Sequence, residues 1–177
     1  MKERGFERKY LPEFVYGGID GSVTTFAVVA GSIGASLAPG IILILGFANL
    51  FADGFSMAIS NYLSMKSQQE LHMHHKDAKR FQGKHPVKTG LATFFSFIII
   101  GFIPLLSFVI SLFIEPLRNY NFTASIALTA MALAIVGAVK GHVVRKHFLR
   151  SALETLLIGS IAAILAFAVG YLLRSLA

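Results

Sequence analysis

The sequence contains no cysteine, and only 14% of its 177 residues are charged. The absence of cysteine excludes a disulfide framework and any metal site built from thiolates. So few charges, with 55% apolar residues and a mean hydropathy of +0.68, lie outside the usual range of soluble domains. We therefore expect an integral membrane protein, in which the net charge of +7 marks the cytoplasmic side and does not indicate nucleic-acid binding.

Five apolar segments are long enough to cross a bilayer, which needs roughly 20 mostly apolar residues. They are about 14–36, 40–64, 89–113, 121–142 and 152–174. The charged start of the chain leads directly into the first segment, without the features of a cleaved secretory signal. The sequence therefore predicts an all-α, polytopic membrane protein, with a single transmembrane domain over residues 1–177, five transmembrane helices and a cytoplasmic loop at 66–88.

The basic residues are distributed unequally between the connections. Fourteen Lys and Arg lie in the N-terminal tail, in the loop 66–88 and in the loop after the fourth span, whereas the other side has only Arg118 and Arg174. Because Lys and Arg are enriched on the cytoplasmic side of membrane proteins, we expect a cytoplasmic N-terminus and a C-terminus outside. On the cytoplasmic side, Lys140 and Glu154 are expected to form an ion pair at the membrane boundary.

The spans differ in the size of their side chains. Small residues are dense in the first, second, fourth and fifth spans and allow helices to pack closely in lipid. The third span instead carries five Phe residues between positions 94 and 108. This composition favours a third helix that faces lipid or a second subunit.

Two aspartates, Asp20 and Asp53, lie inside the first two spans, and each is followed by glycine. A carboxylate at membrane depth is unfavourable and usually faces a partner, a cavity or an ion path. The helical rise places Asp20 about 9 Å and Asp53 about 16 Å from the cytoplasmic ends of their spans, so both could face one cation. The alternative is that each is protonated, bonds to a neighbouring carbonyl or Ser, and contributes only to packing.

A polar stripe follows one face of the second span, because its members are each four residues apart. They are Asn49, Asp53, Met57 and Asn61. Carboxylate and amide oxygens suit hard divalent ions, whereas the thioether of Met57 favours softer transition metals. The set favours Fe²⁺ or a similar divalent ion as ligand. The alternative is that Met57 is an ordinary packing residue.

A second group of possible metal ligands follows that span. If the helix continues, Glu70, His74 and Asp77 share one face, and His72 and His75 form a pair three residues apart. Such spacings could bind a divalent metal at the mouth of an ion path. The alternative is a solvated, His-rich helix end, followed by a basic segment near anionic lipid.

Four sequence blocks resemble the vacuolar iron transporter family. They are GGIDGSVTT at 17–25, NLFADGFSMA at 49–58 followed by NYLS at 61–64, GAVKG at 137–141, and LETLLIG at 153–159. The resemblance implies a five-helix protomer that forms a homodimer with an ion path between the subunits. It also implies export of cytosolic Fe²⁺, and often Mn²⁺, in exchange for protons, with Asp20 and Met57 at intramembrane metal positions and Asp53 at a position that is often acidic.

Two departures from that family concern the metal ligands. Several eukaryotic members have Glu where this chain has Asn61, and they insert a helical cytoplasmic domain, rich in Glu and Met, between the second and third spans. Only about 23 residues, 66–88, fill that gap here. The chain is therefore expected to be a short member without the large metal-binding domain, with Glu70 and the His cluster as a reduced substitute.

The leading hypothesis is a proton-coupled exporter of Fe²⁺, or of Mn²⁺, that uses no cofactor and is not an enzyme. Its metal ligands would be Asp20, Asp53, Met57, Asn61, Glu70 and His74, and its partners lipid, protons and a second copy. A plasma membrane location is favoured over a vacuolar one by the short loops. The alternatives are a membrane metal sensor without transport, a passive metal channel, and an intramembrane aspartyl protease with Asp20 and Asp53 as its dyad.

Overall fold

The computed structural model describes residues 6–74 and 84–176, and every regular element within those ranges is a helix. The helices are α1 (Phe6–Gly34), α2 (Pro39–His74), α3 (Pro86–Gly101), α4 (Ile103–Ile110), η2 (Glu115–Tyr120), α5 (Asn121–Val143), α6 (Phe148–Leu173) and η3 (Arg174–Leu176). Four of them are long and apolar enough to cross a membrane, and the bent pair α3–α4 passes the same test when its two helices are taken together as one broken span. The predicted all-α, multi-pass membrane protein is confirmed.

The third span is bent at Phe102, where α3 and α4 meet at 43°. Pro104 lies in the first turn of α4, and proline interrupts a helix because it has no N–H and its ring crowds the preceding turn. The hydroxyl of Ser125 on α5 donates to the carbonyl of Pro104 at 2.7 Å. A backbone acceptor at the bend is thereby satisfied inside the protein, as the hydrocarbon interior of a membrane requires.

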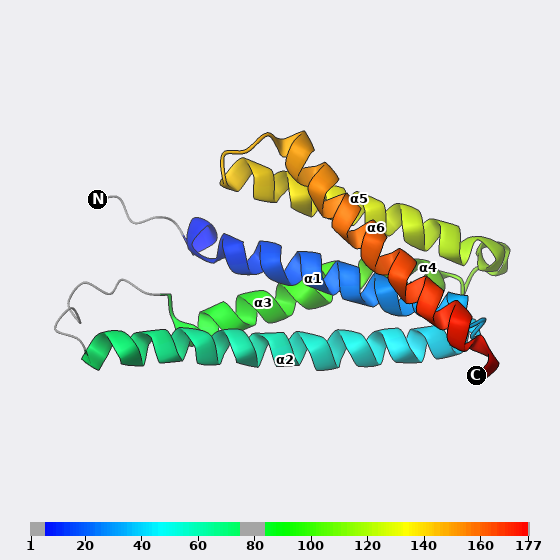
Figure 1. Ribbon diagram of the computed structural model, residues 1–177, viewed down its shortest axis with the longest axis horizontal. Coiled ribbons are helices and arrows are strands. Elements are labelled where there is room, and N and C mark those ends of the chain that lie inside the picture. Colours follow the sequence, from blue (N-terminus) through cyan, green and yellow to red (C-terminus); the bar gives the residue numbers. More distant parts are fainter. Residues whose placement is uncertain (1–5, 75–83, 177) are drawn as a thin grey trace.

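The connections between the helices lie at alternate ends of the molecule (Figure 1). The start of α1, the end of α2, the start of α3 and the α5–α6 turn are at one end, which we call the N-terminal end. The α1–α2 turn, the α4–α5 connection and the end of α6 are at the opposite end. This alternation matches the unequal distribution of basic residues, because Lys66, Lys84 and Lys140 belong to the first set of segments.

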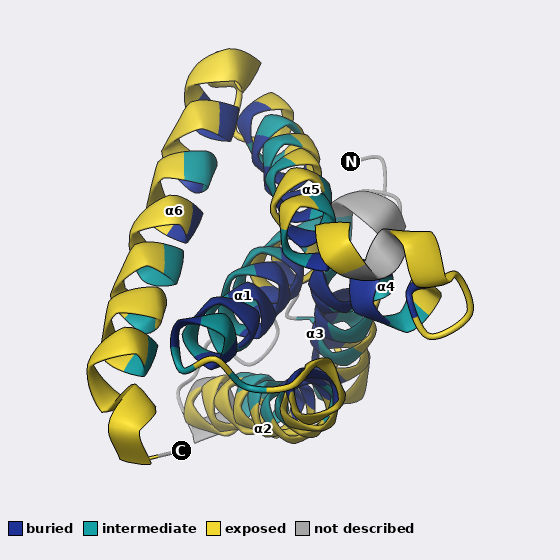
Figure 2. Cartoon of the chain, turned by 90° about the vertical axis from the view of Figure 1, so that its right-hand side faces the viewer, coloured by how far each residue is buried: buried dark blue, intermediate teal, exposed yellow. Residues whose placement is uncertain are grey.

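Helix α1 occupies the centre of the bundle and contacts every helix from α2 to α6 (Figure 2). The Phe-rich α3 packs between α1 and α2, and Phe97 is fully buried there. One side of α3 is thus packed inside the bundle, whereas Leu91, Phe95 and Ile99 on its other side are exposed, so for that side the expectation of lipid or a second subunit stays a prediction. The most exposed helix is α6, which contacts the bundle along one narrow side (Figure 2).

Helix α2 is longer than its apolar part. At 36 residues it spans about 54 Å, compared with about 30 Å for the hydrocarbon core of a bilayer. The helix continues through Glu70 to His74, so these two residues, four positions apart, lie on one face of α2. The end of α2 therefore extends beyond the membrane at the N-terminal end.

Candidate functional site

Helices α1 and α3 touch at glycines near the middle of α1. A Cβ atom at Gly21 would lie 2.5 Å from the carbonyl oxygen of Phe97, and one at Gly17 would lie 2.6 Å from the carbonyl oxygen of Thr93. A Cβ atom at Gly101 would lie 2.8 Å from the carbonyl oxygen of Gly21. The two backbones are thus in direct contact, which is typical of small-residue packing between membrane helices.

Helix α2 packs on the same part of α3. A Cβ atom at Gly54 would lie 3.2 Å from the ring of Phe97, and one at Gly90 would lie 2.8 Å from the carbonyl oxygen of Ala58. Gly21 therefore rests on the backbone of Phe97 and Gly54 on its ring. This shared contact explains why both intramembrane aspartates precede a glycine: the glycines dock on α3 and bring the two carboxylates to one place.

The carboxyl groups of Asp20 and Asp53 are close enough for the charge of Asp53 to act on Asp20. Both residues are half-buried, which means that each lies between the packed core and the exposed surface of the bundle. Met57, one turn further along α2, is half-buried on the same face as Asp53. The structure thus brings together the two acidic residues that the sequence singles out, and Met57 lies one helical turn from Asp53.

Asn61 lies two turns from Asp53 on the same face of α2 and is held by α3. Its Nδ2 donates to Thr93 Oγ1 at 2.6 Å, and that hydroxyl donates to the carbonyl of Thr89 at 3.1 Å. The amide nitrogen is therefore engaged in helix packing, and the amide oxygen is the atom with which Asn61 could bind a metal.

We expect Thr93→Val to destabilise the contact between α2 and α3. The substitution leaves Nδ2 of Asn61 without its acceptor, and an unsatisfied buried donor costs about 1–3 kcal/mol. Thermal unfolding in detergent should show a fall of roughly 2–8 °C for a chain of this size. Thr123→Val, at an exposed position on α5, is the matched control and should leave the midpoint unchanged.

Glu70 and His74 lie away from this group. Seventeen residues separate Glu70 from Asp53 along α2, which corresponds to about 26 Å. Glu70 is exposed and pairs loosely with Lys66 at 3.9 Å, a surface ion pair of little energetic weight. His74 ends α2 at the same exposed end, whereas the side chains from His72 to His75, and Asp77, lie outside the part of the chain that is described.

Within the described residues, no group of three or more His, Asp or Glu side chains is placed to hold a metal ion. Asp20 and Asp53 offer two charged groups, and Met57 and the oxygen of Asn61 offer neutral donor atoms on the same face of α2 as Asp53. Divalent ions such as Mg²⁺ and Ca²⁺ take six or more ligands, which exceeds these four donor groups. A single copy of these residues is therefore an incomplete site for a fully dehydrated ion.

A buried ion pair at the N-terminal end was not predicted from the sequence. Glu13 on α1 is almost fully buried, and its Oε1 lies 2.6 Å from the Nζ of Lys84, just before α3. The spacing of seven residues places Glu13 on the same face of α1 as Asp20, and that signal is visible in the sequence. The partner is 71 residues away and could not be inferred. In contrast, the expected pair of Lys140 and Glu154 is confirmed at 3.4 Å.

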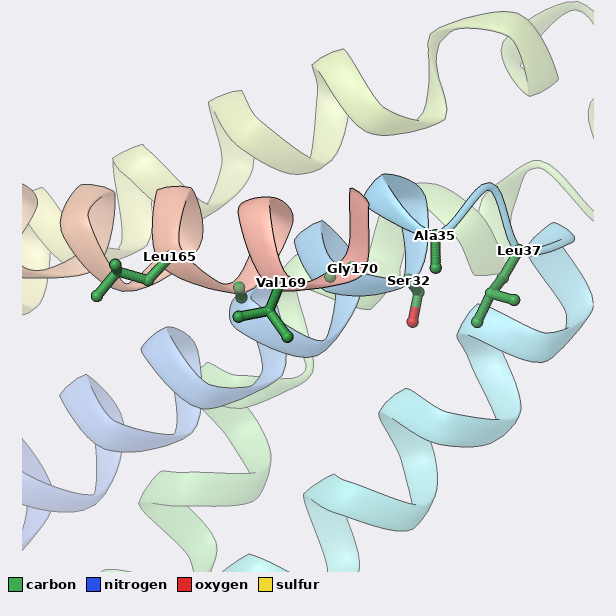
Figure 3. Close-up of a pocket in the computed structure, with 8 residues that line it drawn as sticks. Ser32, Ala35, Leu37, Leu165, Val169 and Gly170 are labelled. Carbon is green, nitrogen blue, oxygen red and sulfur yellow. The ribbon is translucent and has the colours of Figure 1, made fainter. Parts of the chain in front are cut away.

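A groove with a volume of about 470 Å³ lies at the opposite end, between the end of α1, the α1–α2 turn and α6 (Figure 3). Ser32 and Leu37 line it from one side, and Leu165, Val169 and Gly170 line it from α6. Ser32 brings a hydroxyl to an otherwise apolar wall. The groove contains none of the acidic residues and has no chemistry in common with the aspartate pair.

The described chain is thus an all-helical, multi-pass membrane protein with an acidic residue inside each of its first two candidate spans. The chain matches the sequence model of the VIT family over residues 11–82 and 71–171, and it belongs to that family. This is a family of transporters and not of enzymes, so the protease hypothesis is set aside.

Curated relatives align with nearly the whole chain. The vacuolar iron transporter of Plasmodium berghei is 27% identical over 98% of this chain and 86% of its own length. The vacuolar iron transporter of Toxoplasma gondii is 27% identical over 93% of this chain and 74% of its own length. Vacuolar iron transporter 1 of Arabidopsis thaliana is 25% identical over 88% of this chain and 82% of its own length. The first alignment has 234 positions and exceeds the 177 residues of this chain, so the relative contains sequence that this chain lacks.

Proposed function

We propose that this protein exports a divalent transition metal, Fe²⁺ and also Mn²⁺, from the cytoplasm in exchange for protons. The observation that carries the proposal is the pair of half-buried carboxylates, Asp20 and Asp53, which lie close enough for the charge of Asp53 to act on Asp20. The relatives are named as iron transporters, which supports iron as the cargo. Met57 adds a thioether, which is a better ligand for Fe²⁺ than for Mg²⁺ or Ca²⁺.

The electrostatics of the pair supply the coupling. Two neighbouring carboxylates in a medium of low dielectric constant repel each other unless a cation or protons neutralise them. A bound divalent cation neutralises both carboxylates. After the cation leaves, bound protons neutralise them. Metal and protons therefore compete for the same two groups, and this competition is what an exchanger requires. Alternating occupancy by metal and protons would link metal export to proton entry.

The exposed side of α2 supports a homodimer with the ion path between the subunits. Asp53, Met57 and Asn61 lie at the border between the packed face of α2 and its exposed face. That exposed face carries Phe51 and Phe55 at the same depth. A second copy facing it would supply the ligands that one chain lacks and remove the pair from lipid. Glu70 and His74, at the end of α2, would collect metal at the mouth of the path.

The orientation follows from the basic residues. The N-terminal end, which includes Lys66, Lys84 and Lys140, would face the cytoplasm, and the C-terminus would lie outside. We place the protein in the plasma membrane because its loops are short, although the relatives are named as vacuolar. A lower pH outside the cell than in the cytoplasm would then drive metal export.

Metal flux in proteoliposomes tests the proposal. The full chain is reconstituted with an acidic lumen, and Fe²⁺, kept reduced, is supplied outside while a lumenal dye that iron quenches reports uptake. We expect accumulation above the external concentration only while the pH gradient lasts. Equilibration that does not depend on the gradient would indicate a passive channel, and binding without flux would indicate a sensor.

A further inference from the structure

The ion pair of Glu13 and Lys84 is unusual in its burial and in its incomplete bonding. The side chain of Glu13 is 9% exposed and that of Lys84 is 26% exposed. Oε1 of Glu13 accepts from Lys84 at 2.6 Å, but the buried Oε2 has no hydrogen-bond partner among the described residues. A buried pair is a weak source of stability unless all its polar atoms are satisfied. Stability alone therefore does not account for this pair.

The pair lies on the line that leads to the aspartates. Glu13 and Asp20 are seven residues apart on one face of α1, which corresponds to about 10 Å along the helix. Glu13 is nearer the N-terminal end, where the basic connections gather. An ion that enters from that end meets the depth of Glu13 before that of Asp20.

The backbone around Lys84 is fixed by two further contacts. Nε2 of Gln69 on α2 donates to the carbonyl of Lys84 at 3.0 Å. The N–H of His85 donates to the hydroxyl of Tyr10 on α1 at 3.2 Å. Lys84 is therefore held between α1 and α2 at the start of α3, and its ammonium group reaches Glu13 from a fixed backbone.

We propose that the Lys84 ammonium is a tethered cation that occupies Glu13 at the N-terminal mouth of the ion path, and that an entering divalent cation replaces it there. The buried Oε2 of Glu13, which has no hydrogen-bond partner among the described residues, becomes a second ligand atom for the ion once the ammonium moves aside. As the ion binds both oxygens, the ammonium withdraws to solvent. The pair keeps the carboxylate neutralised while no metal is present. This assignment rests on the proposed function for the path itself, but its binding step is tested without transport.

The test measures Mn²⁺ binding to the full chain in detergent, with free Mn²⁺ quantified from its paramagnetic resonance signal. Lys84→Met removes the competing cation, and we expect binding at least about tenfold tighter than in the wild type. Adding Glu13→Gln to that variant should abolish the gain. Lys140→Met, which removes a basic residue from its pair with Glu154, is the matched control and should bind within twofold of the wild type.

A structural ion pair gives a different pattern. It predicts that Lys84→Met and Glu13→Gln impair binding in the same direction and that the double variant recovers wild-type binding. This pattern would overturn the proposal. So would unchanged binding in Lys84→Met, or a gain in affinity that persists when Glu13→Gln is added. If Lys84→Met fails to fold, Lys84→Gln retains a hydrogen-bond donor for Glu13 without the charge and gives the same comparison.

Transport distinguishes this proposal from the proposed function. If the wild type moves Fe²⁺, we expect the KM at the N-terminal end to fall in Lys84→Met and to rise in Glu13→Gln. A wild type without flux contradicts the transporter but leaves the binding comparison decisive for Lys84. A wild type with flux but with the same KM in both variants contradicts the tethered cation alone.

Discussion

Asp20→Asn should abolish uphill Fe²⁺ uptake while leaving the protein folded. Removing one charged partner from a buried ionic site costs on the order of 3–5 kcal/mol, or about 150- to 5000-fold in affinity for the ion. The amide also cannot exchange a proton, so coupling to the pH gradient is lost with the ligand. We expect the initial rate of gradient-driven uptake to fall by at least about 100-fold.

The stability of this variant separates loss of function from misfolding. The charge of Asp53 acts on Asp20, and removing one of two neighbouring negative charges relieves their repulsion. The thermal midpoint of Asp20→Asn should therefore equal or exceed that of the wild type. Glu115→Gln, an equivalent change at an exposed position in η2, should retain full uptake. Undiminished uptake in Asp20→Asn would contradict the proposed mechanism.

The long helices could be predicted from the sequence because hydropathy and length are local properties. Four expected spans match α1, α2, α5 and α6, and the helical continuation of α2 to His74 also holds. The bend of the third span is different. Pro104 indicates an interruption, but the hydrogen bond from Ser125 of α5 to the carbonyl of Pro104 comes from another helix. A residue pattern within one segment does not contain that contact.

The same distinction applies to the candidate site. Asp20 and Asp53 are conspicuous because a charge within an apolar run is rare, and their depths could be compared from the helical rise. What brings them together is Phe97 of α3, which contacts Gly21 and Gly54. Phe97 belongs to a helix that composition alone assigns to lipid or a second subunit. Long-range packing of this kind, like the pair of Glu13 and Lys84, is visible only in three dimensions.

Gly21→Ala should show how tightly the α1–α3 contact positions the acidic pair. The new methyl group would lie 2.5 Å from the carbonyl oxygen of Phe97, and both groups belong to rigid helices. Alanine gains about 1 kcal/mol in helix propensity, but overpacking costs about 1–3 kcal/mol and more where backbone must move. We therefore expect a lower thermal midpoint, by roughly 2–6 °C, because α1 is displaced from α3.

That displacement moves Asp20 relative to Asp53, and binding sites tolerate only about 0.5 Å of misplacement. Gradient-driven uptake of Fe²⁺ should therefore fall by about tenfold or more, although no ligand has changed. Gly40→Ala is the matched control, because a Cβ atom there meets nothing within 4 Å in the first turn of α2. It should keep full uptake and an equal or higher thermal midpoint. Wild-type uptake and stability in Gly21→Ala would show that contact with Phe97 is not what holds the two carboxylates together.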